Sequence, residues 1–250
     1  MKKKKKLIIM GILFSCFCVK ESVAQNQFIV EGINYQVQDE TKVVVAKIDG
    51  FDYYGDIVIP EQVMTVDSNT YSVVGIKAGA FGHCDCLKSI KLPNTLEFIG
   101  TGAFSSCNNL KSITLPNSVT SIESFAFSDC TKLAKIIIPN NVEKITGQCF
   151  RGCTSLTSVT FGTGVKQIEN NAFSNCTALV SVKIPANVES IKDNAFVGCS
   201  KLQTVSIANS NMKYTDYAFN KTPYFKAHSK RTNSSSSNSN SKKRKNTVIY

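Results

Sequence analysis

The 250-residue sequence has no tryptophan and only two histidines, His83 and His228. It also has no G-x-S-x-G elbow, no glycine-rich phosphate loop and no H-E-x-x-H motif. Because acid–base and metal-assisted catalysis draw on such residues, we predict that the protein is not an enzyme, with no catalytic residue and no cofactor. Residues 83–86 read His-Cys-Asp-Cys but lack a second ligand pair at zinc spacing, so no metal site is predicted.

Long apolar runs are missing after the amino terminus. There, five lysines at 2–6 precede an apolar run at 7–19 that is too short to span a bilayer, and small residues at 22–24 suit a cleavage site. We predict a signal peptide over 1–24 and an exported chain, either secreted or associated with the cell surface or outer membrane. Lipidation at Cys16 is the alternative, since residues 13–16 loosely resemble a lipoprotein box. No transmembrane helix is predicted.

The body of the chain lacks net charge. The sequence has 29 Lys+Arg and 18 Asp+Glu, but residues 25–228 hold 17 of each sign. The formal net charge of +11 therefore belongs to the two ends. The basic run at 242–245 is of a kind that contacts nucleic acid or anionic surfaces. Export disfavours nucleic acid, and we predict none as a partner.

One five-residue motif recurs throughout the chain. AFSSC at 103–107 returns as AFSDC at 126–130, AFSNC at 172–176 and AFVGC at 195–199. Its phenylalanine and cysteine recur every 23 residues, and so do leucine, isoleucine and valine positions between them. A fixed period of this length is typical of a solenoid with one coil per repeat. The periodic core residues are Phe81, Phe104, Phe127, Phe150, Phe173, Phe196, Phe219, Cys84, Cys107, Cys130, Cys153, Cys176 and Cys199.

Each coil is expected to contain one strand and one turn. Residues 110–115 end in the alternation Ile113-x-Leu115, which suits a half-buried strand. Pro116 has no N–H to give to a sheet ladder and ends the strand. Ala126 and Phe127 begin a short turn or helical segment, in which the phenylalanine fills the widest part of the core. We expect stacked strands to form a parallel sheet, with each phenylalanine ring on its neighbour.

The pattern L-x-x-I-x-L-P-x-x-V-x-x-I-x-x-x-A-F-x-x-C resembles the leucine-rich repeat of the BspA-like class, found in surface proteins of Bacteroidetes, related bacteria and some parasitic protists. It covers residues 57 to about 223. The resemblance implies an α/β fold: a right-handed solenoid of 23-residue coils, with a parallel sheet on one face and short helical turns or irregular segments on the other. It also implies adhesion to host matrix, a host receptor or other bacteria. The alternatives are a structural or scaffolding envelope protein without a host ligand, or a glycan-presenting accessory.

The domain boundaries follow the ends of the repeat. Residues 25–56, which alternate like strands over 28–37 and 43–48, are predicted to form a β-hairpin cap, because the open end of a solenoid exposes strand edges and core. The solenoid is predicted over 57–225. Ten extra residues in its first coil should form a hairpin around 67–69. The Ser/Asn-rich basic segment 226–250 is predicted to be a disordered tail.

The cysteines raise the question of disulfides. Eight follow residue 24, enough for four bridges in an exported protein. The six periodic ones form one uniform column, which does not select pairs, so we expect buried free thiols. Cys149 occupies the alanine position of its coil and should be core. Cys86 lies off the pattern and should be exposed.

The outward positions of the predicted strands form the candidate binding surface, called the sheet face below. It is a flat surface of serine, threonine and lysine without the aromatic and arginine residues that usually anchor interfaces. A protein or glycan ligand would be held by many weak contacts, and a solvated face without ligand is the alternative. We expect a monomer. The candidate residues are Lys88, Lys91, Lys111, Ser112, Thr114, Lys135, Thr157, Ser158, Thr160, Ser181, Lys183, Thr204 and Ser206.

Overall fold

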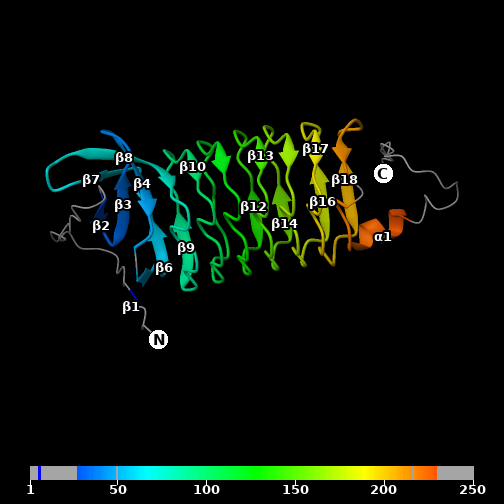
Figure 1. The fold of residues 1–250 in the computed structure, drawn as a ribbon, viewed down its shortest axis with the longest axis horizontal. Coiled ribbons are helices and arrows are strands. Elements are labelled where there is room, and N and C mark those ends of the chain that lie inside the picture. The colour runs from blue at the N-terminus through cyan, green and yellow to red at the C-terminus, as the bar shows by residue number, and fades with distance from the viewer. Residues whose placement is uncertain (1–4, 7–26, 49, 216, 230–250) are drawn as a thin grey trace.

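The computed structural model describes residues 5–6, 27–48, 50–215 and 217–229. The described chain is an elongated solenoid whose coils stack side by side along its long axis (Figure 1). Most of the predicted signal peptide, including Cys16, and residues 230–250 of the predicted tail lie outside the described residues. Of 1–24, only β1 (Lys5–Lys6) is described, and it pairs in parallel with β5 (Phe51–Asp52). Within the described part, no helix is long and apolar enough to cross a membrane.

Three antiparallel strands form the amino-terminal end. They are β2 (Gln27–Val30), β3 (Ile33–Val37) and β4 (Lys42–Ala46). The single strand expected over 28–37 is thus two strands. Glu31 and Gly32 have positive φ angles of 49° and 77°, which a two-residue hairpin turn requires. β4 then pairs in parallel with β8 (Thr70–Ile76), so this sheet runs into the first coil.

The long first coil contains the expected hairpin. It begins with β6 (Gly55–Val58), after which β7 (Gln62–Met64) pairs antiparallel with β8. Residues 65–69 make the turn, and the Thr65 N–H donates to the Asn69 carbonyl at 2.9 Å. The ten extra residues therefore add a hairpin without interrupting the stacking of the coils.

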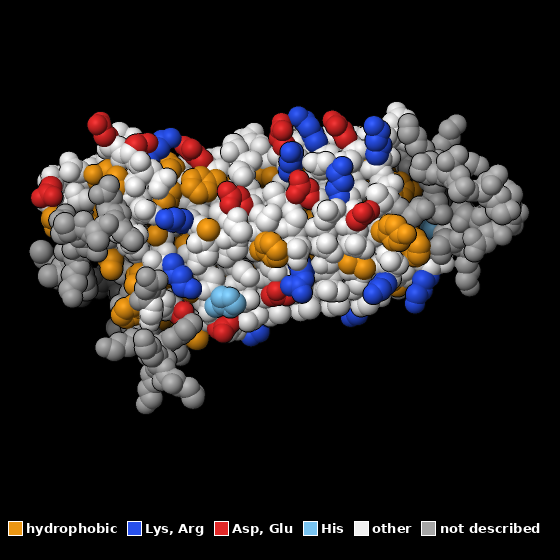
Figure 2. All heavy atoms as spheres, viewed as in Figure 1, with side chains coloured by type: hydrophobic (Ala, Val, Ile, Leu, Met, Phe, Trp, Pro, Cys, Tyr) orange, Lys and Arg blue, Asp and Glu red, His pale blue; other side chains and the backbone are white. Residues whose placement is uncertain are grey.

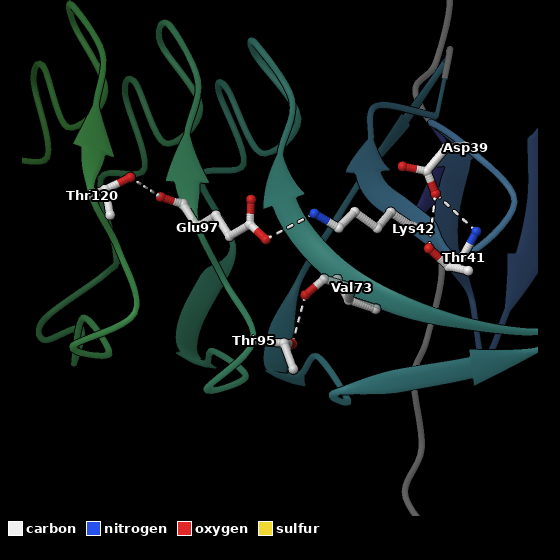
Figure 3. A network of polar contacts seen from close by, with 7 residues as sticks. All are labelled: Asp39, Thr41, Lys42, Val73, Thr95, Glu97 and Thr120. Carbon is white, nitrogen blue, oxygen red and sulfur yellow. Dashed lines mark hydrogen bonds and ion pairs between the residues drawn. The ribbon is translucent and has the colours of Figure 1, made fainter.

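Polar contacts link the amino-terminal sheet to the following coils (Figure 3). The Lys42 ammonium on β4 lies 3.1 Å from the Glu97 carboxylate, and the Thr120 hydroxyl donates to the Glu97 backbone carbonyl at 3.2 Å. The Thr95 hydroxyl donates to the Val73 carbonyl on β8 at 2.7 Å. The side chains of Lys42 and Glu97 are 42% and 51% exposed, and ion pairs this accessible to solvent contribute little. The backbone ladders therefore fix the position of the first coils.

The predicted parallel strands are present, but they pair two by two. β6 pairs with β9 (Leu87–Lys91), β12 (Lys135–Ile137) with β14 (Ser158–Thr160), and β16 (Ser181–Ile184) with β18 (Thr204–Ile207). In the last two pairs, partners lie one repeat apart in the sequence, as Lys135 and Ser158 do. The strands of successive coils therefore stack in register.

The prediction of a strand over 110–115 is wrong. Ile113 and Leu115 are buried, as the alternation requires, and the Lys111 carbonyl accepts the Ala134 N–H at 3.1 Å. Residues 110–117 nevertheless form no strand ladder. Burial fixes which side chains point inward, whereas a strand also requires a ladder of backbone hydrogen bonds, and side-chain alternation does not specify that ladder.

A second parallel ladder of two-residue strands follows later in each coil, where helical turns or irregular segments were expected. The α/β description is therefore too helical: α1 (Pro223–Ser229) is the one helix among the described residues. The second ladder consists of β10 (Phe98–Ile99) and β11 (Ser121–Ile122), which continue the sheet of β8, and of β13 (Lys144–Ile145), β15 (Gln167–Ile168), β17 (Ser190–Ile191) and β19 (Lys213–Tyr214).

Seven buried phenylalanines form a continuous column through the core. From Phe81 to Phe219, consecutive rings are nearly parallel, with interplanar angles of 1–10° and centroids 5.1–5.4 Å apart. The Phe104 N–H donates to the Ala126 carbonyl of the next coil at 2.8 Å, and equivalent bonds recur along the column. At the amino-terminal end, the Tyr53 ring lies 4.7 Å from Phe81. The rings therefore join the amino-terminal segment and the coils into one core.

Helix α1 closes the other end. Thr222 replaces the periodic cysteine; its hydroxyl donates to the Phe219 carbonyl at 2.6 Å and accepts the Phe225 N–H at 3.0 Å. Thr222 is thus the N-cap of a helix whose first residue is proline. The Tyr224 ring meets Phe219 edge-on at 5.4 Å and covers the last ring of the column. The helix extends past the boundary expected after residue 225.

Candidate functional site

The sheet face is exposed in the structure. All thirteen candidate residues are exposed, while the neighbouring Ile90, Ile136 and Val182 are buried in the core. The strand register places Lys135 beside Ser158 and Lys183 beside Ser206. The structure thus brings these residues together on one rigid surface. Their binding role stays a prediction.

Two apolar side chains interrupt this polar surface. Ile137 is 67% exposed and Val180 is 47% exposed. Ile137 lies next to Thr160 in the register of β12 and β14, so an apolar position adjoins hydroxyl groups near the middle of the solenoid. The sheet face is therefore not uniformly hydrophilic, and the isoleucine offers apolar contact to a ligand.

Few polar groups of the sheet face are used within the protein. The Ser89 hydroxyl donates to the Asp56 carboxylate, and the Thr157 hydroxyl donates to the Ala134 carbonyl at 3.1 Å. A hollow lies elsewhere, on the second ladder, between Thr120, Asn141 and Lys144. A ligand of the sheet face would therefore lie on an open surface.

The charged side chains of the second ladder are arranged differently from those of the sheet face. In Figure 2, acidic and basic side chains are interspersed along the upper edge of the solenoid, above β13 and β17. Lys166 pairs with Glu143 at 2.9 Å there, and hydrogen bonding and attraction from Lys166 lower the pKa of the Glu143 carboxyl. At this point of the ladder, a basic and an acidic side chain thus neutralise each other.

The cysteine column supports the turns. The Cys107 thiol donates to the Phe81 carbonyl of the preceding coil at 3.1 Å. The same contact recurs at 3.1–3.2 Å for Cys130, Cys153, Cys176 and Cys199. The Phe81 carbonyl already accepts the Cys84 N–H at 3.1 Å, so the thiol adds a second, weak bond between coils. A small side chain that is a weak donor suits this buried place. The column therefore has a structural role.

The described cysteines are all free. The six periodic ones and Cys149 are buried, and Cys86 is exposed. Burial raises the pKa of Cys84 and of Cys149 to about 12. The pKa of Cys107 is also raised, first by hydrogen bonding with the Cys130 thiol and then by burial. These thiols stay protonated at neutral pH, which makes them poor nucleophiles.

Thiol labelling should separate Cys86 from the buried cysteines. In a chain with Cys16→Ser and Cys18→Ser, we expect one thiol to react with a water-soluble reagent within minutes, and the other seven to react only after unfolding, because buried protonated thiols are inert. Adding Cys86→Ser should abolish the fast reaction. The count is read by mass spectrometry. Fast labelling of two or more thiols in the native chain contradicts the buried column.

Residues 83–86 do not form a cluster of metal ligands. His83 and Cys86 are exposed, whereas Cys84 is buried in the core. Among the residues that the structure places, no three His, Cys, Asp or Glu side chains lie close enough to hold a metal ion. The periodic role of Cys84 accounts for its presence without a ligand.

Sequence comparison identifies the repeat. The family described as the BspA type leucine-rich repeat region matches six copies, over residues 74–178 and 131–242. No curated protein matches the sequence significantly.

Solved structures show the same fold. A leucine-rich cell surface protein of Faecalibacterium prausnitzii A2-165 is 26% identical (78% of this chain, 56% of that chain, TM-score 0.57). A leucine-rich repeat protein of Bacteroides ovatus ATCC 8483 is 29% identical (78% and 57%, TM-score 0.60). The T. pallidum leucine-rich repeat protein is 27% identical (86% and 97%, TM-score 0.68). This chain thus spans little more than half the length of the first two proteins. Because the family match covers more than half of the sequence, the chain belongs to the BspA-type leucine-rich repeat family.

Proposed function

We propose that the chain is an exported or cell-surface interaction module that adheres through the sheet face to host matrix, a host receptor or another bacterium. The observation that carries this proposal is the exposure of all thirteen candidate residues on a frame that the phenylalanine column holds rigid. The F. prausnitzii relative is described as a cell surface protein, which supports the location. Repeat solenoids commonly use extended surfaces of this kind for binding.

The proposal includes the domain organisation and the course of the chain. A signal peptide over 1–24 directs export, residues 25–56 cap a right-handed solenoid at 57–225, and residues 226–250 are a basic tail. The protein is a monomer, secreted or held at the surface, with lipidation at Cys16 as the alternative attachment. The hairpins of β2–β4, which cover the first coil, support the capping role.

Capture of plasma and matrix proteins by the immobilised full chain tests this function. We expect that alanine at Thr157, Thr160, Ser181 and Lys183 lowers retention by about tenfold or more, because many weak contacts are lost together. Alanine at Thr120, Ser121, Lys144 and Ser190 of the second ladder should leave retention unchanged. Equal retention by the two variants rejects the sheet face as the site.

The second candidate function is that of a structural or scaffolding envelope protein without a host ligand, or of a glycan-presenting accessory. The lack of aromatic and arginine residues on the sheet face favours it, since such residues usually anchor interfaces. A wild-type chain that captures no plasma or matrix protein, while being retained in the cell envelope, supports this role instead.

A further inference from the structure

Lysines gather at the amino-terminal half of the sheet face. Lys88, Lys91, Lys111 and Lys135 come from three successive coils, and all are exposed. Among the described residues none of the four forms an ion pair. Asp56 on β6, which accepts the Ser89 hydroxyl, adds one negative charge beside the four lysines. A protein body with balanced charge thus concentrates unpaired positive charge on one surface.

The spacing of these lysines is set by the fold. Lys88 and Lys111 occupy equivalent positions of adjacent coils, whose Phe81 and Phe104 rings are 5.1 Å apart. Lys88 and Lys91 lie three residues apart on β9, which is about 10 Å along a strand. The four ammonium groups therefore cover a patch of about 10 Å by about 10 Å. This size suits two or three anionic groups of one extended polymer.

The residues around the lysines indicate the type of polymer. Ser89, Ser112 and Thr114 lie between them and offer hydroxyl groups to sulfate, carboxylate or sugar oxygens. The outward columns carry no aromatic side chain on which nucleobases could stack, which disfavours single-stranded nucleic acid. They also carry no arginine or aromatic anchor of the kind that protein partners use.

We propose that this lysine patch binds a linear anionic glycan through its sulfate or carboxylate groups. The inference rests on the proposed adhesive function and names the ligand chemistry of one part of the same surface. Each lysine provides attraction to one anionic group. The backbone that carries the lysines is already ordered in the coils, so binding has to order only the lysine side chains. Because the lysines are exposed, binding weakens as salt screens the attraction.

The positive charge at both ends of the chain must be removed before binding to the lysine patch is tested. In every full-length variant, glutamine replaces the basic residues of both ends, so that neither end contributes to binding: the lysines at 2–6, Lys20, Lys230, Arg231 and the basic residues at 242–245. The patch variant adds Lys88→Gln, Lys91→Gln, Lys111→Gln and Lys135→Gln. The matched control adds Lys144→Gln, Lys192→Gln, Lys213→Gln and Lys221→Gln, which removes the same net charge from exposed residues outside the sheet face. An arginine variant of the four patch lysines keeps their charge.

Heparin supplies sulfate groups, hyaluronate supplies carboxylates alone, and dextran is the neutral control; calorimetry at low and at physiological salt gives the Kd. We expect heparin, hyaluronate or both to bind, and the patch variant to raise the Kd by about 30-fold. The charge-matched control and the arginine variant should stay within about threefold of the background chain. Circular dichroism checks that each variant is folded.

Three results overturn the inference. One is that neither anionic glycan binds the background chain, and another is that patch and control variants lose affinity equally, which indicates a non-specific field. The third is that oligo(dT) or polyglutamate binds the patch as tightly as the glycans do. None of these results rejects the adhesive function itself, which fails if the chain captures no plasma or matrix protein or if the capture does not depend on the sheet face.

Discussion

Phe150→Ala is expected to lower the free energy of unfolding by about 3–5 kcal/mol. Phe150 is fully buried in the middle of the column, with the rings of Phe127 and Phe173 at 5.4 and 5.2 Å on its two faces. Truncation removes both contacts and leaves a cavity that the neighbouring coils cannot fill, because their own rings and backbone bonds fix their spacing. Each coil of a solenoid contacts mainly its neighbours, so one cavity weakens two interfaces.

Phe125→Ala is the matched control, since it deletes the same side chain outside the column. Phe125 is 38% exposed, with a positive φ of 61°, a conformation that a bulky residue adopts at a cost. We expect its truncation to change the unfolding free energy by less than about 1 kcal/mol. Urea unfolding followed by circular dichroism measures both variants. A similar, small loss in the two variants contradicts a continuous phenylalanine column.

The periodic core could be predicted from the sequence because one packing problem recurs in every coil. Phe104 and Cys107 return at a fixed interval since each coil fills the same space, and the structure buries both residues. The alternation Ile113-x-Leu115 likewise identified the inward side chains, although residues 110–117 are no strand. Side-chain burial is encoded residue by residue, whereas strand pairing depends on hydrogen bonds between coils.

The second ladder and the turns were harder to predict. A two-residue strand such as Ser121–Ile122 leaves only one buried isoleucine as its signal, which a loop shows equally well. The turns did leave a signal. Ser106, Asp129 and Asn175, two residues after the phenylalanine, all have φ near +60°, and asparagine, aspartate and glycine tolerate this conformation best. Asp, Asn or Gly recurring at that position could have identified the turn.

The sheet face was predictable as a surface but not as a site. Alternation identifies Lys111 and Thr114 as outward residues, and they are exposed. The grouping of unpaired lysines depends on which carboxylates lie nearby, as Glu143 lies beside Lys166 on the second ladder. That information is three-dimensional. A ligand leaves still less trace, because binding by many weak contacts requires no distinctive residue.

Alkaline pH should destabilise the protein strongly, because its thiols resist ionisation only when folded. Burial raises the pKa of Cys84 and Cys149 to about 12, and the pKa values of Cys107, Cys153 and Cys176 are raised as well. An unfolded thiol has a pKa of about 8.5. Above that pH the unfolded chain releases protons that the folded chain retains. The stability contributed by the buried thiols is thus complete below about pH 8.5 and is lost as pH rises towards the folded pKa values.

The size of this effect follows from the number of thiols. Each buried thiol lowers the unfolding free energy by about 1.4 kcal/mol per pH unit once the unfolded thiol is ionised, so these five give a limiting slope of about 7 kcal/mol per pH unit. Urea titrations at pH 7, 8, 9 and 10 measure the slope. Cys107→Thr should reduce it by about one fifth, since a threonine hydroxyl does not ionise and the buried Thr222 shows that the cysteine position accepts threonine. Cys86→Ser, at the exposed cysteine, should leave the slope unchanged. A free energy of unfolding that stays constant from pH 8 to pH 10 contradicts a column of buried, protonated thiols.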